Sequence, residues 1–459
     1  MGGTGVSPVP AASRTGETPV PPNQDANSVT INTSEGPTRA PTSAAPAEFP
    51  ASAAAIEPPE QPSSTRTLLT LALALFLTML PVTMLVPVLK ELVLDRFGQA
   101  RAWAHVFMSI NMVGAALLAP LGGALADRLG RRRPVLMIAA LADAALLWTM
   151  PHANSPALLM ALRFLEGGAH IVALTTIMAM AADGCGPHRR GRVMGLIGSA
   201  LILGTAVGAP LGGRLGQSEP SLVFQVGGGI SLLVAVLAAA ALHGCRARQH
   251  SRSTWEALAL LRTRPQLATV FALAFVDRLC VGVIVSSFVL YLGECCALTP
   301  GQRGGLLALF LFPFALLCYP VGRLADRVGR VWLMLAGNIG FGLMFAVYGF
   351  LPAAWLPAAM IGSGVLSAML FSPNLAICGD LAPAAQRASA FAGFNTAGSL
   401  GFFCGPIVGG LTCWAAVQAG YDVSAGYRAA FVAAGVCVVV CAVTVAPWLT
   451  RLPARHLVR

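Results

Sequence analysis

The sequence predicts an all-α integral membrane protein with twelve transmembrane helices in two related halves. Three observations lead to this fold class: an apolar composition, twelve long apolar stretches, and one polar loop that occurs twice. Of the 459 residues, 56% are hydrophobic and only 11% are charged. A soluble domain carries roughly 25% charged residues, so this chain lacks the side chains for a surface that faces water everywhere.

Twelve apolar stretches follow one another from about residue 67 onward. Each has about 17–28 residues, enough to cross a hydrocarbon core of about 30 Å. Because lipid offers the backbone no hydrogen-bond partners, each stretch must be a helix. The stretches lie at 67–89, 102–124, 135–151, 156–181, 192–214, 221–242, 266–292, 304–325, 331–350, 355–379, 388–416 and 428–449.

Polar segments divide the chain into five parts. The first is rich in Pro, Ala, Ser and Thr without apolar periodicity, which predicts disorder. The longest polar interruption separates two sets of six stretches, and within it Trp255 to Leu261 form either a short interfacial helix or a plain linker. The parts are a disordered cytoplasmic tail (1–65), a first six-helix half (66–242), a cytoplasmic linker (243–265), a second six-helix half (266–450) and a cytoplasmic tail (451–459).

Arginine placement predicts the orientation. Arginines cluster after the even-numbered stretches, whereas the connection from Pro151 to Pro156 carries no charge. By the positive-inside rule both termini are cytoplasmic, in an inner or plasma membrane. The net charge of +11 lies in short clusters between apolar runs. This pattern favours membrane orientation over nucleic-acid binding.

The repeated loop is GGALADRLGRRRP at Gly122 to Pro134, echoed by GRLADRVGR at Gly322 to Arg330, about 199 residues later. An acid at a membrane edge can contact a helix N-terminus or an arginine in one conformation and lose that contact in another. A tight turn that only fixes orientation is the alternative; the duplication favours such a conformational latch. The latch residues are Gly123, Asp127, Arg128, Gly130 and Arg131, with Gly322, Asp326, Arg327, Gly329 and Arg330.

Both loops resemble the conserved loops of the major facilitator superfamily, and the similarity covers about residues 67–450. The resemblance, closest to the twelve-helix drug/proton antiporter-like branch, implies two pseudo-symmetric six-helix bundles around a central cavity, with alternating access by rocking of the halves. It also implies that Asp127 contacts the eleventh helix in the outward-facing state.

Leu162 to Ala169 resemble the family's fourth-helix motif, whose arginine is linked to proton transfer, although Glu166 replaces the usual glutamine. Arg163 and Glu166 are spaced i, i+3 and can pair within the helix near mid-membrane. Buried charge there is usually functional, and the alternative is a structural ion pair.

A Gly- and Pro-rich pattern on helices five and eleven resembles the motif associated with antiporters, with an alanine interrupting the copy on helix five. Proline permits a kink and glycine admits a close partner helix. The pattern predicts bent gating helices, although packing alone would select the same residues. The predicted kink residues are Gly208, Pro210, Gly212, Gly405, Pro406 and Gly409.

The strongest single candidate for a functional residue is Asp277. At the helical rise of about 1.5 Å per residue it lies about 18 Å beyond Pro265. Asp277 and Arg278 diverge by about 100°, so one faces the cavity and the other a helix interface. A carboxylate removed from water can bind and release a proton; an interhelical salt bridge is the alternative. Asp143 ranks lower because no partner is evident nearby in sequence, and we interpret His170 as a satisfied bundle histidine.

No catalytic or nucleotide-binding pattern is present in the sequence, which predicts a protein that is not an enzyme and uses no cofactor or metal. The 11 cysteines form no disulfide or metal framework; for the adjacent pair Cys295 and Cys296, we favour inert packing over reactivity.

We therefore interpret the chain as a monomeric secondary transporter in a lipid bilayer, exporting a small amphipathic or hydrophobic compound in exchange for protons. Two alternatives stay open. One is transport of a polar metabolite, such as a sugar or organic anion, paired to Arg163 or Arg278. The other is a non-transporting membrane sensor on the same fold.

Overall fold

The computed structural model describes residue 2 and residues 65–98, 101–183, 190–242, 254–383 and 386–450. At a few positions within these ranges, Gly123 and Asp127 among them, only the backbone is described. The predicted disordered tail apart from residues 2 and 65, residues 243–253 of the predicted linker and the C-terminal tail therefore lie outside the described residues.

The first half contains six long helices within the described ranges. They are α1 (Thr65–Met84), α2 (Arg101–Leu129), α3 (Arg132–Thr149), α4 (Pro156–Asp183), α5 (Arg190–Ser218) and α6 (Pro220–Ala241). Short turns follow α1 and α3: η1 (Val86–Val88), η2 (Lys90–Asp95) and η3 (Met150–His152).

The second half begins after α7 (Thr254–Thr263), a ten-residue helix that decides between the two alternatives for the linker in favour of a short helix. The seventh long run is continuous through three segments, α8 (Leu267–Val283), η4 (Ile284–Phe288) and α9 (Val289–Glu294). The remaining elements are α10 (Pro300–Val328), α11 (Arg330–Val347), η5 (Tyr348–Phe350), η6 (Ala353–Trp355), α12 (Leu356–Leu381), α13 (Arg387–Gln418) and α14 (Val423–Thr450).

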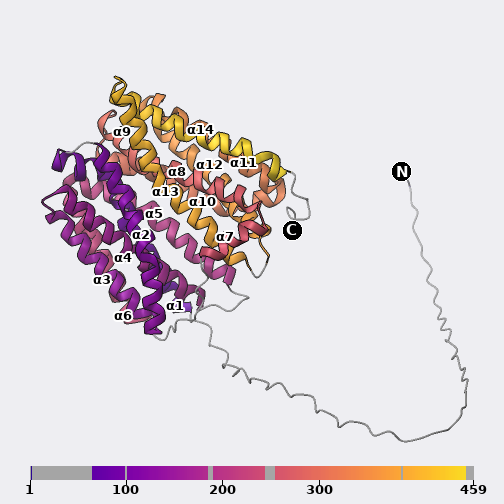
Figure 1. Cartoon of the computed structure of the whole chain (residues 1–459), viewed down its shortest axis with the longest axis horizontal. Helices are drawn as coiled ribbons and strands as arrows, with labels where there is room; N and C mark the ends of the chain where they lie inside the picture. The colour runs from indigo at the N-terminus through magenta and orange to yellow at the C-terminus, as the bar shows by residue number, and fades with distance from the viewer. Residues whose placement is uncertain are drawn as a thin grey trace, which may run out of the picture. The chain divides into compact units, whose positions relative to one another are not determined.

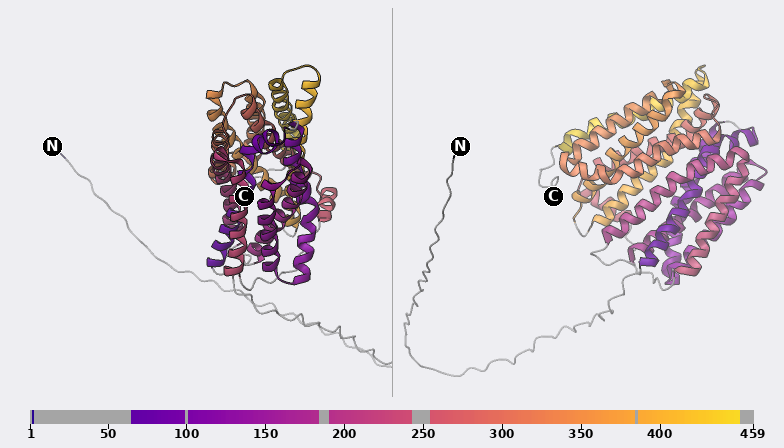
Figure 2. Two further views of the ribbon diagram at one scale, coloured as in Figure 1. Left: turned by 90° about the vertical axis from the view of Figure 1, so that its left-hand side faces the viewer. Right: turned by 180° about the vertical axis from the view of Figure 1, so that it is seen from behind.

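Twelve helical runs in the described ranges are long and apolar enough to cross a membrane, which confirms the predicted fold class. Figures 1 and 2 show the helices of the two halves as two groups, from indigo to magenta and from rose to yellow.

The two halves repeat the same packing. In the first half α1 packs on α5, α2 on α4, and α3 on α6. The equivalent pairs of the second half are α8 with α13, α10 with α12, and α11 with α14. The main contacts between the halves follow the same symmetry, because α5 packs on α10 and α2 on α13.

Glycines bring the equivalent helices of each half together. A Cβ added at Gly208 would lie 2.5 Å from the Leu80 carbonyl oxygen, and one at Gly405 would lie 2.6 Å from the Gly282 Cα. These predicted kink positions therefore hold α5 against α1 and α13 against α8. Helices α5 and α13 continue through Pro210 and Pro406, and bending at these prolines stays a prediction.

An irregular turn interrupts the first helical run of each half, which the sequence did not predict. In the first half η2 has π-helical geometry, and in the second half η4 does so. Such π-bulges occur frequently at functional sites. Both segments lie at the same end of the membrane domain as the contact between α9 and η2.

Candidate functional site

A buried ionic network occupies the interior of the first half. Arg163 and Glu166 are each 1% exposed, and Arg163 Nη1 donates to Glu166 Oε2 at 2.6 Å, so the expected i, i+3 pair forms. Asn111 Nδ2, from α2, donates to the same carboxylate oxygen at 2.7 Å. The Arg163 guanidinium also lies 5.0 Å from the centre of the Phe107 ring, a cation–π contact.

Asp143, from α3, belongs to the same network. It is buried and accepts a hydrogen bond from Ser231 Oγ of α6 at 2.5 Å, so it has a partner that lies 88 residues away in sequence. Its carboxylate, the Glu166 carboxylate and the His170 imidazole place ligand atoms within 4.8 Å of one another. His170 Nδ1 has no hydrogen-bond partner among the described residues, so the expectation of a satisfied histidine is not met at this nitrogen.

In the second half Asp277 and Arg278 diverge as expected. The Asp277 side chain is 8% exposed and the Arg278 side chain 33%, and Arg278 Nε lies 3.8 Å from Asp277 Oδ2. That separation is an ion pair beyond hydrogen-bond distance. The Arg278 guanidinium instead lies 5.0 Å from the centre of the Phe371 ring on α12. Asp277 and the Arg163 network thus sit in different halves.

The end of the molecule with the repeated loops holds ion pairs within each half. Asp326 pairs with Arg330 at 2.8 Å, and Arg330 also pairs with Asp380 at the end of α12. In the first half, Arg132 pairs with Asp183 at 2.8 Å. Each loop is therefore tied to the end of the fourth helix of its own half, through a pairing that the sequence did not predict.

The other predicted latch residues have simpler positions. Arg128, Arg131 and Arg327 are exposed. Gly130 and Gly329 have φ of 59° and 110°, a left-handed region that favours glycine and explains why both loops need one there. The contact predicted for Asp127 concerns a side chain outside the described part of the structure.

The opposite end, which carries residues 90–101, holds the ion pairs between the halves. Arg303 of α10 pairs with Glu91 of η2. Arg101 Nε of α2 pairs with Glu294 Oε2 of α9 at 2.7 Å, and Tyr427 Oη donates to the same oxygen at 3.0 Å. Both inter-half ion pairs that the described residues form lie at this end. Sequence analysis missed them because no local spacing connects these partners.

The cysteines have no disulfide among the described residues. Desolvation and the neighbouring Glu294 carboxylate raise the pKa of Cys295 to about 11. A thiol, rather than the nucleophilic thiolate, therefore predominates near neutral pH. This agrees with the predicted low reactivity, although Cys295 is exposed rather than packed in the core.

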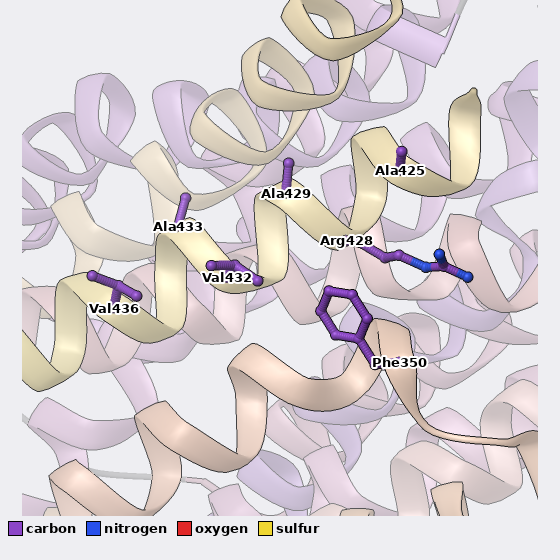
Figure 3. A pocket seen from close by; sticks show the side chains of 7 residues that line it. All are labelled: Phe350, Ala425, Arg428, Ala429, Val432, Ala433 and Val436. Atoms are coloured by element: carbon purple, nitrogen blue, oxygen red, sulfur yellow. The ribbon is translucent and has the colours of Figure 1, made fainter. Parts of the chain in front are cut away.

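A surface pocket of about 550 Å³ lies along α14, next to the end of α11 (Figure 3). It contains none of the predicted site residues, and its lining consists of Phe350, Ala425, Arg428, Ala429, Val432, Ala433 and Val436. In Figure 3 the Arg428 side chain extends past the Phe350 ring, and its guanidinium lies 5.6 Å from the centre of that ring.

Comparison with solved structures supports the fold. The chain superposes on a bacterial homolog of the human lysosomal transporter Spinster, in an inward-facing and unoccupied conformation, with a TM-score of 0.72 at 16% identity, over 86% of this chain and 99% of that one. A nucleoside transporter gives a TM-score of 0.68 at 16% identity, over 84% and 100% of the two chains.

Two curated relatives align over most of their length. A class G tetracycline resistance protein of Vibrio anguillarum is 27% identical over 62% of this chain and 77% of its own. A 3-(3-hydroxy-phenyl)propionate transporter of Escherichia coli is 26% identical over 66% and 75%. A multidrug resistance protein B homolog of Mycobacterium tuberculosis is 31% identical over 38% of this chain and 32% of its own.

The family described as the Major Facilitator Superfamily matches residues 71–294 and 267–458, which together cover most of the chain. Twelve membrane-spanning runs within the described ranges, repeated packing in two halves and transporter structures as neighbours agree with this match. The chain is a multi-pass membrane transporter that belongs to the Major Facilitator Superfamily.

Proposed function

We propose that this protein exports a small amphipathic or hydrophobic compound in exchange for protons, by alternating access. The observation that carries the proton coupling is Asp277. Its carboxylate is buried at mid-helix and accepts no hydrogen bond from the described residues, and Arg278 Nε is 3.8 Å away. An incompletely paired carboxylate is costly inside a membrane, and binding a proton removes that cost.

Alternating access is supported by the asymmetry of the inter-half contacts. Ion pairs join the halves at the 90–101 end. On α5, a Cβ at Gly213 would clash with Pro300, whereas Gly195 and Gly198, toward the opposite end, have no neighbouring atoms within 4 Å of an added Cβ. With the arginine-rich loops in the cytoplasm, this arrangement is inward-facing, and both termini lie on the cytoplasmic side of the inner membrane.

The predicted residues have two roles in this mechanism, proton coupling and latching. Asp277 and the Arg163–Glu166 pair are the proposed coupling sites, one in each half. Asp127 and Asp326 are the proposed latches, which hold the cytoplasmic ends together in the outward-facing state. The protein works as a monomer in this proposal, since each half of the site comes from the same chain.

Export of an amphipathic or hydrophobic compound is supported by the relatives named for tetracycline and multidrug resistance. A second candidate is an organic anion with an aromatic ring. The half-buried Arg278, which lies over Phe371, offers a cation beside an aromatic face, and one relative is named as a transporter of 3-(3-hydroxy-phenyl)propionate.

A two-step experiment tests the proposal. Purified protein is screened for compounds that raise its thermal unfolding midpoint, because a ligand that binds only the folded state stabilises it. The flux of each hit is then measured in proteoliposomes with and without a pH gradient. Gradient-driven accumulation of a lipophilic hit supports the first candidate, and loss of binding of aromatic carboxylates in Arg278→Gln supports the second. No flux of any hit would favour the sensor interpretation.

A further inference from the structure

The network in the first half contains an uncompensated charge. Arg163 contributes one positive charge, and Asp143 and Glu166 contribute two negative charges, within one buried cluster. Arg163 is hydrogen-bonded to Glu166, so Asp143 has only the neutral Ser231 as a hydrogen-bond donor. With neutral His170 the cluster carries one net negative charge, which is costly in the interior of a membrane domain.

Polar atoms without partners point to what neutralises this charge. Asp143 Oδ1 and His170 Nδ1 are both buried without a hydrogen-bond partner among the described residues. Both residues are more than nine-tenths buried, with exposures of 3% and 8%. Buried polar atoms are nearly always satisfied in native proteins. One carboxylate oxygen of Asp143 and one imidazole nitrogen of His170 lie within 4.8 Å of each other, so a single cation bound at either group is stabilised by the other.

Among the described residues, no other titratable group compensates the cluster. Helices α2 and α6 present the neutral Asn111 and Ser231 to it. The remaining elements packed on α4 are α1, α5 and η3. Helices α1 and α5 carry no titratable residue between residues 67 and 89 or between 193 and 213, and the only one in η3 is the exposed His152. The groups that decide its charge are therefore Arg163, Glu166 and His170 from α4 and Asp143 from α3.

Charge and ligand chemistry select the cation. A divalent metal would leave the cluster with one net positive charge, because Arg163 already balances one of the two carboxylates. Sodium prefers oxygen ligands, and the imidazole nitrogen of His170 suits it poorly. A proton neutralises the cluster with one unit of charge, and both a carboxylate oxygen and an imidazole nitrogen can bind it.

We propose that Asp143, Glu166 and His170 form a binding site for a single proton in the first half, separate from Asp277 in the second. The proton comes from water on one side of the membrane and returns to water on the other, and no other bond is made or broken. The physiological use of the site rests on the proposed proton coupling, but its occupancy does not.

Infrared difference spectroscopy of the full-length protein in liposomes, titrated with pH, tests the site without a transport substrate. The wild type should show the C=O band of a protonated, buried carboxyl group that titrates as one proton per protein. Asp143→Asn should remove this band. His170→Gln, which keeps a polar side chain, should move its midpoint by about one pH unit or more to lower pH, because the cluster loses one of the groups that can bind the proton.

Asp277→Asn is the matched comparison, and it should leave this band in place. Thermal unfolding of each variant identifies those that fail to fold. If Asp143→Asn does not fold, the shift of the band midpoint in His170→Gln tests the proposed proton site. A Glu166 or Asp143 band that is unaffected by His170→Gln would overturn the shared site. So would a midpoint that falls when sodium chloride replaces choline chloride, or binding of one Mn²⁺ or Zn²⁺ per protein that Asp143→Asn abolishes.

Failure of this proposal is distinguishable from failure of the proposed function. A titrating band in a protein whose flux ignores the pH gradient would leave the proton site intact and remove its coupling role. Gradient-driven flux without the band would retain the coupling and remove this site.

Discussion

The ion pair between Glu91 and Arg303 should set the balance between the inward-facing and outward-facing states. The Arg303 side chain is 1% exposed and that of Glu91 is 20% exposed, and they join η2 of the first half to α10 of the second. Beyond this pair, Arg303 Nε donates only to the Leu298 carbonyl oxygen, at 3.1 Å, among the described residues. The substitution Glu91→Gln would therefore leave a buried guanidinium without its counter-ion.

The free-energy cost of Glu91→Gln follows from the burial of the Glu91–Arg303 ion pair. Removing one partner of a buried ion pair costs about 3–5 kcal/mol, and the partial exposure of Glu91 places this pair at about 3 kcal/mol. When the halves separate at this end, Arg303 reaches water and the cost disappears. The substitution should therefore shift the equilibrium toward the outward-facing state by about 150-fold.

Pulsed electron spin resonance measures this shift. Spin labels at Ser218→Cys and Ala419→Cys, in a cysteine-free background, report the separation of the halves at the 90–101 end. Glu91→Gln should move the population to the longer distance. Asp95→Asn is the control, because it breaks an exposed pair with Lys90 inside one half, worth at most about 1 kcal/mol. Identical distance distributions in both variants would refute the reasoning.

Three further predictions concern packing, buried charge and thiol chemistry. Gly405→Ala should lower the thermal unfolding midpoint, because the added Cβ meets the α8 backbone. Gly198→Ala, which has open space around the added Cβ, should be neutral or stabilising by up to about 1 kcal/mol. Equal effects of the two substitutions would contradict the proposed packing. Glu166→Gln should destabilise the protein by about 1–2 kcal/mol in chemical unfolding, since it replaces the charge-assisted hydrogen bond from Arg163 by a neutral one. An unchanged stability would show that the pair is dispensable. Alkylation of Cys295 by a maleimide at pH 7.5 should be about 100-fold slower than alkylation of a thiol with the ordinary pKa of 9.0. The reaction should accelerate as the pH rises toward the Cys295 pKa of about 11. A fast, pH-independent reaction would contradict this prediction.

The twelve spans and their repeat could be predicted because both depend on local sequence. A run of apolar residues long enough for the bilayer has only one way to satisfy its backbone. The i, i+3 spacing of Arg163 and Glu166 likewise fixed their contact within one helix. Predictions of this kind need no knowledge of which helices are neighbours.

The missed features depend on tertiary packing. Asp143 appeared to have no partner because Ser231 lies on another helix, and His170 appeared ordinary because its proximity to Asp143 is invisible in sequence. The inter-half pair of Arg101 with Glu294 spans 193 residues. The irregular geometry of η4 also arises in a run whose composition is ordinary for a membrane helix.

The most direct test of proton-coupled transport is the movement of protons that accompanies the substrate. Proteoliposomes that contain a pH-sensitive dye are given a compound identified by the stability screen, without an imposed pH gradient. The wild type should change the internal pH as the compound crosses, and Asp277→Asn should lose that change. Uptake of the compound by the wild type with a constant internal pH would contradict the account.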